Sequence, residues 1–387
     1  MQTAVILDGA RTPIGRFLGS YSEVPAVELG VLAATEAMRR SGVEPSDVDQ
    51  TIYGHARQAG NGPNTGRQVS VRAGVPIEVS AYNVNIACGS GMKAVQLGAQ
   101  QIALGESEVI LAGGMENMTR VPFILDRMRT GYRMGDATVY DAMYRDGLLD
   151  PLCGLIMGET AENLVDRYDV SRREQDEFAL ESQQKAKAGA GARAAEMFPV
   201  EAPAGVTLEA DEHPRPDTTL ETLAKLKPVF RDGGSVTAGN SSGITDGAAA
   251  MVLMSEARAK AEGRTPLARI IGMSWAGVPP ETMGIGPVPA TKKVLEKTGL
   301  SLADMDLIEI NEAFAAQVIA CERELKFDRD RLNVNGGGIS LGHPIGMSGA
   351  RILLSLAYAM RAREASLGLA TLCISGGQGL AVVLERA

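Results

Sequence analysis

Cysteine and histidine are scarce in this sequence, which has 4 cysteines and 3 histidines among 387 residues. The four cysteines lie far apart, at positions 88, 153, 321 and 373, and no two of them form a CxxC pair. Neither a zinc site nor a disulfide framework is indicated, because both need characteristic cysteine spacings. We therefore expect no bound metal and a reducing compartment, and each cysteine has to be interpreted separately.

Long apolar runs and an excess of positive charge are also missing. No apolar stretch reaches the roughly 18 residues of a membrane-spanning helix, and the first residues lack the basic and apolar segments of a secretory signal. The 38 basic and 47 acidic side chains give a net charge of 38 − 47 = −9, which disfavours binding to nucleic acid or to an anionic membrane. We expect a cytoplasmic protein that has neither as a partner.

Glycine, in contrast, is abundant, with 45 residues and no collagen-like period. Average proteins contain about 7% glycine, so many backbone positions here are expected to form tight turns or close approaches. The hydrophobic and charged fractions of 45% and 22% are ordinary for a globular protein. At roughly 150 residues per domain, the length predicts two to three domains.

Three sequence blocks of the first half recur in the same order in the second half, which indicates an internal repeat. Residues 42–56 (GVEPSDVDQTIYGHA) align without gaps with residues 299–313 (GLSLADMDLIEINEA) at an offset of 299 − 42 = 257. The second block pairs residues 83–85 with 333–335 and Ser90-Gly91 with Ser348-Gly349. The third block pairs Gly113-Gly114 with Gly376-Gly377.

Each repeat begins with a short apolar run, residues 4–7 or 268–271, and continues into a helical pattern that ends at Gly42 or Gly299. Strands that alternate with helices are typical of a mostly parallel sheet with helices on its faces. The predicted fold is α/β, with two similar βαβ-rich halves related by a pseudo-twofold axis.

The segment from about residue 117 to residue 240 has no counterpart in the repeat and is predicted to be an insertion that covers a site. Within it, the sequence SRRE from Ser171 is a capping box that predicts a helix to about Ala188. We divide the chain into an N-terminal half (1–117 with about 241–267), an inserted loop domain (118–240) and a C-terminal half (268–387).

Cys88 is the first candidate for chemistry, since it precedes a predicted helix in the glycine-rich sequence NIACGSG. A helix N-terminus is expected to lower the pKa of a thiol and expose it as a nucleophile. His343, in the extra loop of the second repeat (GHPIG), lies where a base facing Cys88 is expected. His55 and His213 are interpreted as structural. Cys373 and Asn311 each follow a predicted strand, where a role in chemistry or in packing remains open.

Together these residues resemble the thiolases, which cleave or form 3-ketoacyl-CoA by Claisen chemistry. The resemblance spans nearly the whole chain and rests on motifs in the family's order: NIACGSGMKAV, GGMENM, NEAFAAQ, NGGGISLGHPIGMSGAR and CISGGQG. It implies a thiolase-like fold with α-β-α-β-α layers, an acyltransferase acting in fatty acid metabolism, and coenzyme A as substrate rather than as a permanent cofactor. It also suggests a homodimer or homotetramer.

The resemblance further implies ping-pong chemistry, in which Cys88 is acylated, His343 takes its proton, and Cys373 acts as acid and base at the α carbon. One oxyanion would meet His343 and a water held by Asn311, and the other would meet the backbone N–H groups of Cys88 and Ser375. Residues implied to bind CoA or the acyl group are Arg215, Phe230, Ala238, Ser242, Ile244, Met157, Ala313 and Phe314.

Two departures from the family pattern bear on specificity. Ser375 stands where glycine is usual, and Ile156 stands where relatives specialised for acetoacetyl-CoA carry histidine. The second departure leaves longer 3-ketoacyl chains open as substrates. Decarboxylating ketoacyl synthases and 3-hydroxy-3-methylglutaryl-CoA synthase share the fold but lack the second cysteine, so Cys373 favours the thiolase. A carrier that has lost the reaction would need neither two thiols nor a base.

Overall fold

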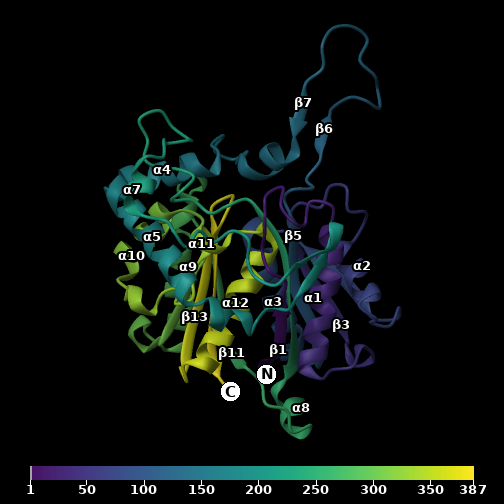
Figure 1. Ribbon diagram of the computed structural model, residues 1–387. Coiled ribbons are helices and arrows are strands. Elements are labelled where there is room, and N and C mark those ends of the chain that lie inside the picture. Colours follow the sequence, from purple (N-terminus) through teal and green to yellow (C-terminus); the bar gives the residue numbers. More distant parts are fainter. Residues whose placement is uncertain (1) are drawn as a thin grey trace.

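The computed structural model describes residues 2–387, so residue 1 of the predicted N-terminal half lies outside the described residues (Figure 1). The order of elements repeats along the chain. The first half comprises β1 (Ala4–Arg11), β2 (Gly15–Arg16), α1 (Ala26–Ser41), β3 (Gln50–His55), α2 (Thr65–Arg72), β4 (Ser80–Val84), α3 (Ser90–Leu104), β5 (Val109–Asn117) and, after the insertion, β10 (Thr245–Ser255) and α8 (Glu256–Ala261). The second half comprises β11 (Ala268–Gly277), α9 (Pro287–Thr298), β12 (Leu307–Ile310), α10 (Ala315–Leu325), α11 (Gly338–Leu341), α12 (Ile345–Ala362), β13 (Leu367–Ile374) and β14 (Gln378–Arg386).

The strands form one mixed sheet in the order β12-β13-β14-β11-β1-β10-β5-β3-β4, and β2 pairs with β10. The two halves join where β1 pairs with β11. The expectation of a mostly parallel sheet was wrong, because only the pairs β3–β4, β3–β5 and β12–β13 are parallel. β14 follows β13 through a tight turn and β10 returns from the insertion, so both run against their neighbours. Apolar runs carry no information on strand direction.

Alternating strand residues divide the core into layers, as predicted. Ile6 and Ala4 of β1 pack in a central cluster with α3 and α12, whereas Val5 and Leu7 face the opposite side, towards α1. In the second half, β13 contributes alternate residues to the central cluster and to a third cluster with α9 and α10. The helices α3 and α12 therefore form a layer between the two halves of the sheet (Figure 1).

Glycine allows α3 and α12 to meet at backbone distance. A Cβ atom on Gly91 of α3 would lie 2.8 Å from the amide nitrogen of Ala350, and one on Gly349 of α12 would lie 2.5 Å from that of Met92. Real Cβ atoms do not approach backbone this closely, so both positions require glycine. Gly91 and Gly349 are the equivalent residues of the second repeat block, and their contact brings the N-termini of the two helices together.

The sequence predicted several local features correctly and one incorrectly. α1 and α9 end at Gly42 and Gly299, both in the left-handed conformation. The predicted equivalence of Gly113-Gly114 and Gly376-Gly377, the third repeat block, was wrong. Gly113 lies inside β5, opposite Tyr53, whereas Ile310, the repeat counterpart of Tyr53, pairs with Thr371. Gly376-Gly377 instead forms the β13–β14 turn, with positive φ angles.

The insertion contains α4 (Met157–Tyr168), α5 (Arg172–Ala188), α6 (Ala190–Ala194), α7 (Leu220–Ala224), the pair β8 (Val200–Ala202) and β9 (Val206–Leu208), and the hairpin β6 (Phe123–Leu125) and β7 (Val139–Asp141). α5 begins after the capping box at Ser171, as predicted. Buried Arg11 of β1 pairs with Glu196 at 2.6 Å and with Asp211 at 2.7 Å, which fastens the insertion to the sheet. The β6–β7 hairpin, in contrast, projects away from the body (Figure 1). Among the described residues, no helix is long and apolar enough to cross a membrane.

We expect Gly349→Ala to lower the free energy of unfolding by about 1–3 kcal/mol, because the new methyl group overpacks the helix contact. Gly191→Ala is the matched control, since a Cβ there meets no atom within 4 Å. It is expected to leave stability unchanged or to raise it by about 0.4–1 kcal/mol. Urea unfolding of both variants is the measurement, and equal stability of Gly349→Ala and the parent protein would contradict the helix-contact argument.

Candidate active site

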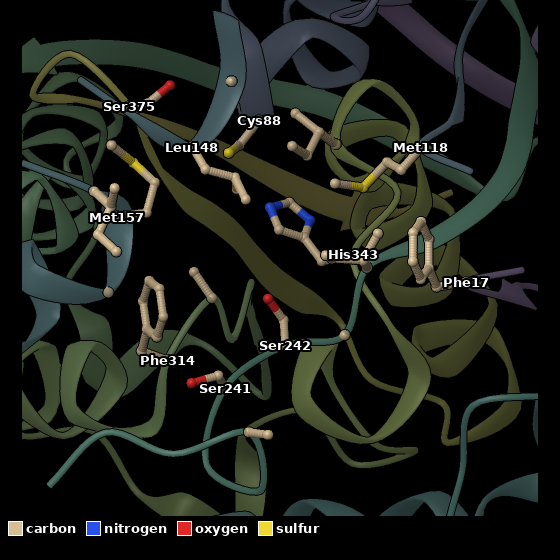
Figure 2. A pocket seen from close by; sticks show the side chains of 18 of the residues that line it. Phe17, Cys88, Met118, Leu148, Met157, Ser241, Ser242, Phe314, His343 and Ser375 are labelled. Carbon is tan, nitrogen blue, oxygen red and sulfur yellow. The ribbon is translucent and has the colours of Figure 1, made fainter. Parts of the chain in front are cut away.

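A cavity of about 500 Å³ lies where the two halves and the insertion meet. Cys88 and His343 face it from the first and second halves, and Leu148, Met157 and Phe314 form part of its wall (Figure 2). The structure brings together all but one of the residues predicted from the sequence. Those that line the cavity are Cys88, Met157, Arg215, Phe230, Ala238, Ser242, Ile244, Ala313, Phe314, His343, Cys373 and Ser375.

Cys88 lies in a short 3₁₀ turn (Ala87–Gly89) between β4 and α3. Ala87 adopts a positive φ of 49°, a strained conformation for a residue other than glycine. Side-chain hydrogen bonds hold this turn. The Asn85 Oδ1 accepts from the Ala87 N–H at 3.0 Å, and the Ser90 hydroxyl accepts from the Ile86 N–H at 3.0 Å and donates to the Ala87 carbonyl at 2.7 Å. The sulfur is thereby fixed towards the cavity.

The expectation that the helix start lowers the pKa of Cys88 was wrong in its net direction. Burial raises the pKa of the Cys88 thiol, and the positive charge of Arg57 and the N–H groups of Ser375 and of Cys88 itself offset this only in part. A water-excluded thiol favours its neutral form. Cys88 therefore needs a base within the cavity to become a nucleophile.

His343 is arranged as that base. Its Nδ1 lies 2.6 Å from the Ser348 hydroxyl, which donates its own proton to the Pro344 carbonyl at 2.9 Å. The hydroxyl must then accept from Nδ1–H, so the lone pair that can take a proton is on Nε2. Burial, reinforced by the charge of Arg351, lowers the pKa of His343 to about 3, so the ring is neutral at physiological pH.

Asn311 is the predicted residue that does not line the cavity, but it contacts the base directly. Its Nδ2 lies 3.4 Å from the Nε2 of His343. The Asn311 side chain is fully buried, and its Oδ1 has no hydrogen-bond partner. An unpaired buried carbonyl oxygen is costly, so it is a position where a bound water or ligand group is expected.

Cys373 is the second-last residue of β13 and is 1% exposed. Burial and the neighbouring Cys88 raise the pKa of its thiol well above the ordinary value. The turn that follows carries Ser375, and the Asp150 carboxylate accepts the Gly376 N–H at 2.8 Å. Asp150 thus links the insertion to the loop whose Ser375 N–H is directed at the Cys88 sulfur.

Glu116 is a functional residue that the sequence reasoning missed, although the GGMENM motif contains it. Its carboxylate, fully buried at the end of β5, accepts the N–H groups of Ala56 at 3.2 Å, Arg57 at 3.0 Å and Gly346 at 2.9 Å. The Nε2 of His55 lies 3.2 Å away. Although burial opposes its charge, His55 and the other donors lower the pKa of Glu116, so it is ionised.

The contacts of Glu116 connect the loops that carry Cys88 and His343. The Ala56 carbonyl accepts from Asn85, which in turn holds the turn before Cys88. Gly346 lies three residues after His343, at the start of α12. Glu116 therefore fixes the nucleophile loop relative to the base loop. No isolated motif revealed this, because the donors come from three distant segments.

The remaining wall of the cavity comes mainly from the insertion. Phe230 packs edge to face on Phe314, with ring centroids 6.0 Å apart, and a Cβ on Gly158 would lie 2.1 Å from the Phe230 ring. The Ser242 N–H donates to the Ala313 carbonyl at 2.9 Å. His213, which we had interpreted as structural, also lines the cavity, with its Nδ1 3.1 Å from the Ser340 carbonyl.

Comparison with known proteins gives concordant matches over the chain. Residues 4–257 match the family model described as thiolase, N-terminal domain, and residues 264–386 match thiolase, C-terminal domain. The chain is 50% identical to acetyl-CoA acetyltransferase of Escherichia coli strain K12 over the full length of both. The crystal structure of the Bacillus anthracis acetyl-CoA acetyltransferase is 48% identical in sequence, with a TM-score of 0.97. The match covers 100% of this chain and 99% of that chain. Human mitochondrial 3-ketoacyl-CoA thiolase in complex with CoA is 43% identical, with TM-score 0.97, and the match covers 100% and 98% of the chains.

We expect Glu116→Gln to lower kcat at least tenfold, because an amide cannot accept all the N–H groups that the carboxylate accepts, and misplaced catalytic groups lose rate steeply. Since the charge of Glu116 raises the pKa of Cys88, its removal should lower the pH midpoint for alkylation of Cys88. Asp246→Asn is the control. Asp246 is also a buried carboxylate, but it accepts hydrogen bonds from Thr119 and not from the loops of Cys88 and His343. If Glu116→Gln lost no more activity than this control, the linking role would be wrong.

Proposed function

The chain belongs to the thiolase family and is a thiolase-type acyltransferase, and we propose that its reaction runs through an acyl intermediate on Cys88. In the cleavage direction, a 3-ketoacyl-CoA and CoA give acetyl-CoA and a shortened acyl-CoA. In the reverse direction, two acetyl-CoA give acetoacetyl-CoA. The observation that supports the proposal best is that the thiols of Cys88 and Cys373 and the neutral imidazole of His343 face a single cavity.

In the first half-reaction, the Cys88 sulfur attacks the β-carbonyl while the Nε2 of His343 takes the thiol proton. The tautomer set by Ser348 leaves this nitrogen free for the task. Negative charge develops on the carbonyl oxygen as the carbon–sulfur bond forms. The N–H groups of Cys88 and Ser375 lie beside the sulfur and are our proposed donors to this oxyanion.

Cleavage of the bond between the α and β carbons leaves the enolate of acetyl-CoA, and its α carbon must then gain a proton. We assign this proton to the Cys373 thiol, which burial keeps protonated. The enolate oxygen is assigned to the Nε2 side of His343 and to a water held by Asn311, whose buried Oδ1 lacks a partner. The thiol of CoA then gives its proton to the Cys373 thiolate and attacks the acyl group on Cys88, whose sulfur leaves and regains its proton from His343.

We propose that the insertion forms the CoA side of the cavity. Arg215 is the assigned contact for nucleotide phosphates, and Phe230, Ala238, Ser242 and Ile244 are assigned to the pantetheine arm. The acyl end of the substrate is assigned to Met157, Ala313 and Phe314. CoA is a substrate in this scheme. We also propose that the chain is divided into an N-terminal half, an inserted loop domain over 118–240 and a C-terminal half.

The decisive measurement is CoA-dependent loss of acetoacetyl-CoA beside that of a medium-chain 3-ketoacyl-CoA. We expect turnover in the parent protein, and loss of at least about a thousandfold in Cys88→Ala, because the proposed acyl intermediate forms on the Cys88 sulfur. Cys373→Ala should abolish condensation but still form an acyl-enzyme on Cys88, detectable by mass spectrometry of the intact protein. Full turnover in Cys373→Ala would exclude its role at the α carbon, and comparable rates on both substrates would show that Ile156 admits longer chains.

We also propose that the chain assembles into a homotetramer. β4 lies at one end of the sheet and its last four residues are only half-buried, whereas the opposite end, β12, is fully buried. An open edge strand is a ready surface for pairing with a second copy. The projecting β6–β7 hairpin exposes large apolar side chains, among them Met134 at 96% and Phe123 at 68%, which indicates a second contact.

Light scattering during gel filtration should therefore give four times the chain mass. Deletion of residues 126–138, the tip of the β6–β7 hairpin, is expected to give a dimer, because the β4 edge is left intact. A monomer in either protein would contradict the role of the β4 edge, and a tetramer after the deletion would contradict that of the hairpin.

A further inference from the structure

Arg57 is a charged residue in the cavity for which the reaction described above has no use. Its side chain lines the same cavity as Cys88, and the residue is only 8% exposed. The Nε atom is buried without a hydrogen-bond partner, and the guanidinium forms no ion pair with any carboxylate of residues 2–387. A buried guanidinium without a counter-ion is costly, so an anionic ligand is expected at this point.

The position of Arg57 shows which part of a substrate that ligand belongs to. A Cβ on Gly147 would lie 2.5 Å from the Nε and Nη2 of Arg57, so the guanidinium lies against the backbone beside Leu148. Leu148 and Cys88 both line this cavity (Figure 2). This is the catalytic end, and the pantetheine arm separates it from the CoA phosphates. The anion is therefore carried by the acyl group.

The protein itself offers two charges near Arg57, and neither forms an ion pair with it, although the charge of Arg57 lowers the pKa of Glu116. Glu116 accepts the backbone N–H of Arg57 but forms no ion pair with its guanidinium, and it is occupied by its other donors. The Cys88 thiolate would carry charge only until it is acylated. Throughout the lifetime of the acyl intermediate, the guanidinium would again lack a counter-ion.

We propose that Arg57 binds a carboxylate at the far end of the acyl group of the substrate. The protein would then act on 3-oxo dicarboxylic acyl-CoA esters. This inference rests on the proposed function. The Cys88 sulfur adds to the β-carbonyl and the α–β carbon bond breaks. Acetyl-CoA leaves after its α carbon gains a proton, and the shortened diacyl group stays on Cys88 until the CoA sulfur displaces it and the proton returns to Cys88. The distal carboxylate takes no part in these steps and is held by the guanidinium fork.

The test compares 3-oxoadipyl-CoA with 3-oxohexanoyl-CoA, two substrates of equal chain length that end in a carboxylate or a methyl group. The readout is the ratio of their kcat/KM values. In Arg57→Leu, we expect this ratio to fall at least tenfold, and in Arg57→Lys we expect an intermediate ratio, because lysine keeps the charge but not the fork. Arg16→Leu removes an exposed positive charge from the same cavity and should leave the ratio unchanged.

A second readout depends on occupation of the cavity rather than on turnover. Succinyl-CoA should protect Cys88 from iodoacetamide at lower concentration than butanoyl-CoA, and Arg57→Leu should remove that difference. An unchanged substrate ratio in Arg57→Leu would overturn the proposal. An equal fall on both substrates with slower alkylation of Cys88 would also overturn it and assign Arg57 to the thiolate. If the parent protein cleaved no 3-ketoacyl-CoA, the thiolase proposal would fail, and the protection assay would still decide the role of Arg57.

Discussion

The backbone contact between α3 and α12 is the constraint on which the rest of the structure depends. Each helix follows a catalytic loop, so the distance between the helices sets the distance between Cys88 and His343. Side chains would hold the helices apart, and only glycine at Gly91 and Gly349 allows them to touch. The same crowding extends to the strands, since a Cβ on Gly114 of β5 would lie 2.1 Å from the Gly346 carbonyl oxygen. The high glycine content therefore serves the site and is not simply a sign of many turns.

This tight contact buries the side chains between the two helices, and burial decides the electrostatics of the site. Burial raises the pKa of Cys88 and lowers that of His343, so the free enzyme holds a neutral thiol beside a neutral imidazole. A thiolate–imidazolium pair is disfavoured until a polarised carbonyl accepts the electrons of the sulfur. Donors that already point at the sulfur then stabilise the new charge without reorganisation. The site is thus arranged for the charge that develops during reaction, not for charge at rest.

Motifs that are continuous in the sequence were predictable, and contacts between distant segments were not. The motifs NIACGSG, GHPIG and CISGGQG allowed the prediction of candidate residues, because each combines a cysteine or histidine with nearby glycines. The segment over 118–240 was predicted to cover a site because it interrupts the repeat, and several of its residues line the cavity. Glu116 and Arg57 escaped notice because their roles depend on partners, or on a lack of partners, that only the folded chain defines. The pKa of Cys88 was misjudged for a related reason, since the helix start was visible in the sequence and the depth of burial was not.

The insertion is part of the catalytic unit rather than an added lid, and Glu312 shows why. This buried residue follows Asn311, and its carboxylate accepts from the Ser182 hydroxyl of α5 at 2.6 Å, from Asn333 at 2.7 Å and from the Ile339 N–H at 3.1 Å. A helix of the insertion, the Asn311 segment and the loop that leads to His343 therefore share one acceptor. Glu116 joins the loops of the two halves, and Glu312 joins the second half to the insertion. Because each carboxyl group is buried, loss of any donor leaves a buried acceptor unsatisfied, and the three parts of the chain are expected to hold the cavity only as one cooperative unit.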